Sequence, residues 1–473
     1  MPCIAPRSRR DKCVTMTGAM QDRVSSGRRM VPFVPFADQA MYLAHVAGGQ
    51  HSVMQSVWRY RRAVDRERLL QFHNKLAHGR LARLLQPALL PFGRHQWVSP
   101  PPLSSSLAIV ETPIAVAELR NWMDAQVELP LDPVLGPGWN LTMQPLEDGS
   151  TVISLVASHC IADGMAGLLA VREAALGECR PPAYPSATAK RSRAGLIAEM
   201  LQVVKDAPVT ARALGRLAHV ARGAQALRRS PTEVPTVAQD DRTVVFPTVF
   251  LRIPTMEWDE AAKGRGANRF TFLAAMTAAF GLALGRVHQN EVSLLIPVNQ
   301  REGLADTSGN CATLATLKVP VDEPFRSLRA LQRRLQETLV RVRREPDPIA
   351  GLLPLVPFVP KRAFRAAGSM AVGALSELPV TCSHLGVWPE EALQIDGTTA
   401  DLFCCRGIDR GVSVRAIEAR QGVASLFSAI IPNFVVLNFV AYQPGVVTNS
   451  EQLRVLAEEL LARYGLAGEL FET

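Results

Sequence analysis

The sequence lacks the short motifs that identify several large classes of enzyme. It contains no Gly-x-Ser-x-Gly nucleophile elbow, no His-Glu-x-x-His zinc motif, no Gly-x-x-x-x-Gly-Lys-Ser/Thr phosphate loop and no complete Gly-x-Gly-x-x-Gly. Its eight cysteines form no Cys-x-x-Cys pair, so neither a disulfide framework nor a zinc site is indicated. These absences argue against a serine hydrolase and against a nucleotide-dependent enzyme. We therefore expect no metal site and no permanently bound cofactor.

Long hydrophobic runs are also missing. The apolar run 270–284 is short for a bilayer span, and polar residues and a proline interrupt the run 425–442. The N-terminal segment 1–30 is basic and has no apolar stretch of the kind found in signal peptides. We expect this segment to be disordered and the protein to be cytoplasmic, with peripheral contact to a membrane as an added expectation.

The chain is rich in apolar residues and carries excess positive charge. Its 473 residues are 48% hydrophobic and 20% charged, which is enough to bury large cores, and the formal net charge is +9. Such a charge suits an anionic membrane surface or a phosphate-bearing substrate. The basic residues lack interleaved aromatic residues, so we expect no nucleic-acid partner.

Strand and helix patterns alternate in two parts of the chain, 31–180 and 241–473. Residues 151–157 predict a buried strand and 165–176 a helix; later residues predict a strand at 411–417 and a helix at 450–463 capped by Ser450. Between the two parts, 181–240 is basic and mostly helical, and we interpret it as a crossover linker. The sequence therefore predicts an α/β fold of two mixed-sheet units with an active-site channel between them.

The second helix expected in this linker is amphipathic. Its apolar and basic residues lie on opposite sides: Leu214, Leu217, Ala218 and Ala221 on one, and Arg212, Arg216 and Arg222 on the other. We favour the interpretation that the charged face is solvated while the helix packs on one domain. Docking on an anionic membrane or a protein partner is the alternative.

A strand-like apolar run, 154–158, leads directly into His159-Cys160-Ile161-Ala162-Asp163-Gly164. A histidine at the end of a strand can keep one ring nitrogen free, and Gly164 permits a sharp turn beside it. Transfer of an acyl group from a thioester to a hydroxyl needs such a base, because an alcohol is a poor nucleophile until its proton is removed. No covalent enzyme nucleophile is then required.

With this His-x-x-x-Asp-Gly motif the chain resembles the thioester-dependent acyltransferase superfamily. That superfamily includes chloramphenicol acetyltransferase, condensation domains, polyketide-associated acyltransferases and wax ester synthase/diacylglycerol acyltransferases. Further segments resemble its motifs in the same order: 131–139, 296–301, 309–310 and 382–386. The resemblance implies two chloramphenicol-acetyltransferase-like units.

The resemblance also implies roles for individual residues. His159 would be the general base, and Asp163 would pair with Arg301 to hold the loop, with Gly164 allowing the close turn. Asn310 would help to position the substrate or the oxyanion. Ser158 stands where condensation domains and wax ester synthases carry the first of two adjacent histidines, and it is a second candidate for positioning the substrate.

Two hypotheses follow from the resemblance. The first is an O-acyltransferase that uses acyl-CoA or an acyl carrier protein as co-substrate and a lipid or glycolipid alcohol as acceptor, in lipid biosynthesis or beside a polyketide synthase. The second is a non-catalytic lipid-binding or scaffold relative, docked to a membrane or partner through the basic linker. The departures at Ser158 and at Arg269-Phe270, where wax ester synthases carry Asn-Asp, motivate the second hypothesis.

Overall fold

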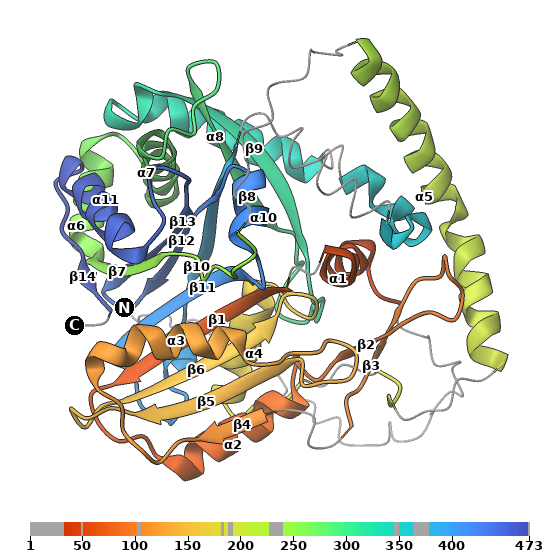
Figure 1. The fold of residues 1–473 in the computed structure, drawn as a ribbon, viewed down its shortest axis with the longest axis horizontal. Coiled ribbons are helices and arrows are strands. Elements are labelled where there is room, and N and C mark those ends of the chain that lie inside the picture. Colours follow the sequence, from red (N-terminus) through yellow and green to blue (C-terminus); the bar gives the residue numbers. More distant parts are fainter. Residues whose placement is uncertain are drawn as a thin grey trace, which may run out of the picture. The chain divides into compact units, whose positions relative to one another are not determined.

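Two mixed β-sheets with flanking helices form the described part of the chain (Figure 1). The structure is a computed structural model that describes residues 33–48, 51–101, 106–180, 184–187, 193–226, 240–344, 350–362 and 378–471. The segment 1–30 that we expected to be disordered lies outside these residues. The expected α/β class with two mixed-sheet units is confirmed.

The first sheet has five strands, and they come from both halves of the chain. In order across the sheet these are β11 (Leu402–Arg410), β1 (His51–Tyr60), β6 (Thr151–Ser158), β5 (Trp139–Pro145) and β4 (Ser106–Ile109). The pair β4–β5 is parallel and the other pairs are antiparallel. Strand β11 comes from the second half of the chain but completes the first sheet, which the sequence did not predict. The division into domains at 31–180, 181–240 and 241–473 stays a prediction.

The second sheet has seven strands, all from the second half of the chain. In order these are β14 (Glu469–Leu470), β7 (Thr248–Pro254), β13 (Phe434–Tyr442), β12 (Val423–Ile431), β10 (Val380–Val387), β8 (Glu291–Asn299) and β9 (Ala312–Pro320). β10 runs parallel to both of its neighbours, whereas the other pairs are antiparallel. A short ladder, β2 (Leu84–Gln86) with β3 (Gln96–Val98), stands apart from both sheets.

Helices connect and flank these strands. The α-helices are α1 (Phe36–Gly48), α2 (Arg66–His78), α3 (Leu119–Glu128), α4 (Gly164–Ala175), α5 (Arg193–Ala226), α6 (Thr255–Gly264), α7 (Arg269–Ala283), α8 (Arg329–Arg344), α10 (Val414–Ala419) and α11 (Ser450–Arg463). The 3-10 helices are η1 (Val116–Glu118), η2 (Glu323–Phe325), η3 (Ala350–Phe358) and η4 (Glu390–Leu393). None of the described helices combines the length and the hydropathy that a bilayer span requires.

Two local expectations were wrong. Residues 411–417 do not form a strand: Ser413 accepts a hydrogen bond from the Ala416 N–H and begins the short helix α10 instead. The helix at 450–463 is present, but its N-cap is Asn449, whose side chain accepts from the Gln452 N–H. In both places a polar side chain satisfies a free N–H at a helix start, which decides where the helix begins.

A buried arginine on β11 makes hydrogen bonds to residues from both halves of the chain. Arg406 of β11 donates to Gln55 of β1 at 2.8 Å and to Asp124 of α3 at 2.7 Å. It also donates to the Thr248 hydroxyl of β7 at 3.2 Å, and its side chain is only 1% exposed. One guanidinium thus joins the first sheet, its covering helix and the second sheet.

We expect Arg406→Ala to lower the free energy of unfolding by about 3–5 kcal/mol, because it leaves buried acceptors without a partner. Unfolding in urea measures the loss. The control is Arg454→Ala on α11, which removes a partly exposed arginine that also pairs with two carboxylates and should unfold close to the wild type. Equal midpoints for Arg406→Ala and the wild type would contradict this account of the junction.

Candidate active site

His159 lies in the turn that joins β6 to α4. All residues of β6 are buried, which explains why most of them are apolar. The His159 N–H donates to the Ser52 carbonyl of β1 at 2.9 Å, and its own carbonyl accepts from the Asn310 amide at 2.8 Å. The backbone on both sides of the imidazole is therefore held by other elements.

The imidazole of His159 is half-buried, and its Nδ1 is shielded from solvent without a hydrogen-bond partner among the described residues. The neighbouring Cys160 is a poor nucleophile, because burial raises the pKa of its thiol to about 12. A base with an uncommitted ring and no reactive thiol beside it fits proton transfer without a covalent enzyme intermediate.

Asp163 pairs with Arg301, as the resemblance implies. Arg301 follows β8, its side chain is 2% exposed, and its Nη1 donates to Asp163 Oδ2 at 3.0 Å while its Nη2 lies 2.9 Å from Oδ1. The Asp163 carboxylate also caps α4 through the Ala166 N–H at 2.8 Å and accepts from the Cys311 N–H at 2.9 Å. The Asp163 carboxylate thus connects the start of α4 with the residues that follow β8 and precede β9.

The same pair holds the loop 308–311, which precedes β9. Arg301 Nη2 donates to the Ser308 carbonyl at 3.0 Å and to the Gly309 carbonyl at 2.9 Å. The Asp163 N–H also donates to the Gly309 carbonyl at 2.9 Å. This loop carries Asn310, so the ion pair determines where the Asn310 amide reaches the His159 backbone.

Gly164 is not among the described residues with positive φ, so its backbone conformation does not by itself require a glycine. Its expected role in the close turn stays a prediction. A Cβ at this position would lie 2.5 Å from Leu385 Cδ2 of β10. The absence of a side chain lets the second sheet approach the first turn of α4.

Asn310 and Ser158 both make contacts within the protein. Asn310 Nδ2 donates to Asp38 Oδ1 at 2.6 Å as well as to the His159 carbonyl. An oxyanion role for Asn310 would require one of these bonds to break. The Ser158 hydroxyl is buried and accepts from the Cys160 N–H at 3.3 Å, which stabilises the turn. Substrate positioning by these two residues stays a prediction.

The sequence did not point to Asp38 of α1. Its Oδ1 accepts from both the backbone and the side chain of Asn310, and its Oδ2 is buried without a partner among the described residues. Burial raises the pKa of the Asp38 carboxyl to about 7, against the opposing effect of the Asn310 hydrogen bond and of nearby Arg83. Its only sequence signal was its place as an acidic residue in the first turn of a helix, which is explained by the helix dipole alone.

Two further histidines, His45 of α1 and His51 of β1, lie close to each other near this end of β1. Their ring centroids are 3.9 Å apart. Burial is the main cause that lowers the pKa of both imidazoles, to about 4 for His45, and the positive charge of Arg410 also lowers both. Both imidazoles are therefore neutral at neutral pH. Within the described residues no three histidine, cysteine or acidic side chains gather into a group that could hold a metal ion.

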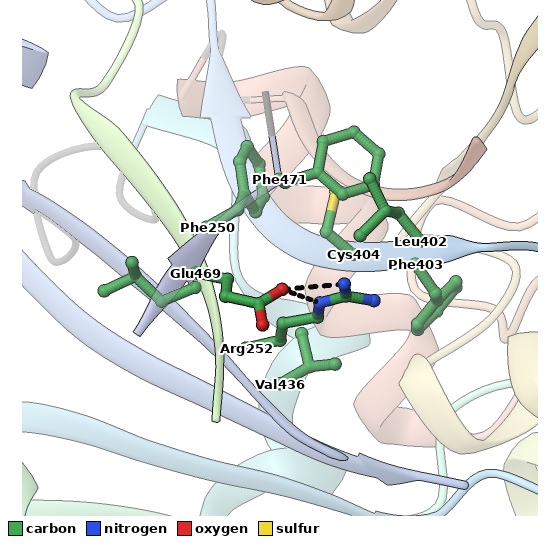
Figure 2. Close-up of a pocket in the computed structure, with 9 residues that line it drawn as sticks. Phe250, Arg252, Leu402, Phe403, Cys404, Val436, Glu469 and Phe471 are labelled. Carbon is green, nitrogen blue, oxygen red and sulfur yellow. Dashed lines mark hydrogen bonds and ion pairs between the residues drawn. The ribbon is translucent and has the colours of Figure 1, made fainter. Parts of the chain in front are cut away.

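Figure 2 shows a small pocket away from these residues, where β7, β11, β13 and β14 meet. It encloses about 190 Å³ of empty space, which includes its opening to solvent, and its lining is mainly apolar. Arg252 and Glu469 form an ion pair at 2.7 Å on this lining. None of the candidate site residues lines it, and the channel between the two units stays a prediction.

No protein-family model matches the sequence, and no curated protein matches it. Solved structures do match the fold. The first condensation domain of the calcium-dependent antibiotic synthetase, in complex with a substrate analogue, has a TM-score of 0.56 at 16% identity, covering 92% of this chain and 96% of that one. A variant of the starter condensation domain of rhizomide synthetase, in complex with C8-CoA and Leu-SNAC, has a TM-score of 0.53 at 13% identity, covering 94% and 96%.

Polyketide synthase associated protein 5 from Mycobacterium tuberculosis also matches, with a TM-score of 0.51 at 13% identity, covering 91% of this chain and 97% of that one. The chain therefore has the condensation-domain fold over nearly its whole described length. This agrees with the superfamily that the motifs resemble.

The loss of Asp163 should destabilise the fold, whereas the loss of the His159 ring should not. We expect Asp163→Ala to lower the free energy of unfolding by about 3–5 kcal/mol, because Arg301 is left buried and unpaired. His159→Ala should unfold close to the wild type, because its ring has no partner among the described residues. Chemical unfolding compares the two, and equal losses would contradict the distinction.

Asp38 should make stability depend on pH. Between about pH 4 and pH 7 the folded state keeps a proton on Asp38 that the unfolded chain has released, so Asp38 lowers the free energy of unfolding as the pH rises, by about 1.4 kcal/mol per pH unit. His45 and His51 act in the opposite direction over part of this range, because burial lowers their pKa. Asp38→Asn should therefore make the slope of the free energy of unfolding against pH more positive than in the wild type by about that amount, whereas exposed Asp322→Asn should leave the slope unchanged. Urea unfolding across this range compares the three proteins, and equal slopes for Asp38→Asn and the wild type would contradict a raised pKa at Asp38.

Proposed function

We propose that this protein is an O-acyltransferase that moves an acyl group from a thioester of coenzyme A or of a carrier protein to a hydroxyl of a lipid or glycolipid acceptor. The observation that carries the proposal is the His159 imidazole, which has no partner among the described residues while its backbone is held from both sides. A base kept free in this way is prepared to take a proton from a substrate.

The proposed reaction needs one base and no metal. Because Nδ1 of His159 is shielded, Nε2 is the nitrogen that exchanges the proton. Nε2 takes the hydroxyl proton of the acceptor, and the oxygen attacks the thioester carbonyl carbon. The tetrahedral intermediate then collapses, the C–S bond breaks, and the imidazolium returns its proton to the leaving thiolate.

Three further observations support this choice of substrates. The structurally similar starter condensation domain was solved with C8-CoA and Leu-SNAC, and another similar protein is associated with a polyketide synthase. The net charge of +9 favours the phosphates of coenzyme A or of a carrier-protein arm. Asp163, Gly164 and Arg301 bring the second sheet and its loop against the histidine turn, as positioning residues.

We expect His159→Ala to lower the rate of ester formation by about 10²–10⁴-fold, because the alcohol then has no base. Purified protein is incubated with acyl-CoA or acyl carrier protein and an extract of lipid alcohols, and free thiol and new esters are followed by mass spectrometry. The control is His78→Ala, which removes an exposed histidine of α2 and should react at the wild-type rate.

Two results would decide against this function. If His159→Ala and the wild type form ester at the same rate, His159 is not the base. If the wild type forms no ester with either class of donor but binds acyl lipid, the protein is the non-catalytic lipid-binding relative.

A further inference from the structure

Helix α5 presents an apolar stripe to solvent. Ile197, Met200, Leu201, Val204 and Leu214 are each between 49% and 70% exposed. The first four recur at helical spacing on one side and form a stripe about 10 Å long at 1.5 Å per residue, whereas Leu214 lies about a quarter turn from their mean direction, on the side of Met200. Figure 1 shows α5 in yellow-green with η3 and α1 to one side of it. Leu214, Leu217 and Ala218, which the sequence placed on the packed side of the helix, are exposed as well.

The opposite face of α5 is polar and faces the protein. The Glu199 carboxylate is buried and accepts from the backbone N–H groups of Leu89 at 3.0 Å and Leu90 at 3.1 Å. About two turns further along the helix, Asp206 pairs with Arg94 at 3.3 Å. The loop that carries Leu89 and Arg94 thus binds both acidic residues of α5.

The outward side of the helix is consequently basic as well as apolar. Lys205 and Arg212 are exposed along one edge of the stripe, and no ion pair involves either of them in the described parts of the chain. Arg193 is exposed at the beginning of the helix. An apolar stripe bordered by cations, with no carboxylate on the same side, is the composition of a helix that lies in the surface of an anionic bilayer.

We propose that α5 docks the protein on an anionic lipid surface, with its stripe in the boundary of the acyl chains and with Lys205 and Arg212 at the headgroups. A second copy of the chain fits less well, because two such faces would bring cations together with no carboxylate between them. An acidic carrier protein would also match the charge, and its binding is an outcome of the test below. The docking goes beyond the proposed acyl transfer and does not depend on it.

Vesicle binding of the full-length protein tests the proposal. The protein is sedimented with vesicles of phosphatidylcholine alone and of phosphatidylcholine mixed with phosphatidylglycerol, at low and high salt. We expect binding to the anionic vesicles that high salt weakens. Lys205→Gln with Arg212→Gln should lower the partition coefficient about 25-fold, at about fivefold per cation. Leu201→Ser with Val204→Ser should lower it at least about tenfold, because both apolar side chains leave the interface.

Matched variants on other helices serve as controls. Val340→Ser with Val455→Ser, and Arg333→Gln with Arg341→Gln, replace exposed residues of the same kinds on α8 and α11 and should bind as the wild type does. Thermal unfolding checks that every variant is folded. Transfer to a water-soluble alcohol by the wild type without vesicles tests the acyltransferase proposal separately, so that either proposal can fail alone.

Three results would overturn the docking proposal. The first is a wild type that binds neither kind of vesicle. The second is a pair of α5 variants that bind as tightly as the controls. The third concerns a dimer, or a complex with an acidic carrier protein, detected by sedimentation velocity. If Leu201→Ser with Val204→Ser abolishes that complex but leaves vesicle binding unchanged, the complex and not the membrane is the partner of α5.

Discussion

The carboxylate of Asp163 is the contact on which the candidate site depends. It caps α4, pairs with Arg301 after β8 and accepts from the backbone of Cys311 before β9. A buried ion pair is costly unless further hydrogen bonds satisfy its donors and acceptors, and here the Arg301 guanidinium also binds the carbonyls of Ser308 and Gly309, while its Nε has no partner among the described residues. The loop cannot move without breaking several bonds together.

This arrangement makes the geometry at His159 a property of both halves of the chain. The first sheet supplies the Ser52 carbonyl that binds the His159 N–H, and the loop before β9 supplies the Asn310 amide that binds its carbonyl. The first sheet itself is completed by β11, held by Arg406 against β1 and α3. Neither half alone contains all the contacts that fix the imidazole, so the site exists only in the assembled fold.

The sequence predicted best where a local pattern and the tertiary environment agree. The buried strand expected at 151–157 is β6, all of whose residues are buried, and the helix expected at 165–176 is α4, which Asp163 caps. Strand β11 was missed because Arg406 and Arg410 interrupt its apolar pattern, although both are buried and bonded to distant residues. Asp38 was missed for a related reason: its partner Asn310 lies 272 positions away, and no local pattern encodes that contact.

Helix α5 illustrates a limit of amphipathic patterns. A periodic sequence defines two faces, but the neighbouring groups decide which face is buried. The free N–H groups of Leu89 and Leu90 and the guanidinium of Arg94 need acceptors, and only the polar face of α5 can supply them through Glu199 and Asp206. Arg94 in turn donates to the Val34 carbonyl and lies over the Phe36 ring at the start of α1, so the inward face of α5 is attached to the helix that carries Asp38. Because polar contacts determine this orientation, the apolar side chains remain outside, and their exposure is a consequence of how the loop and α1 are held.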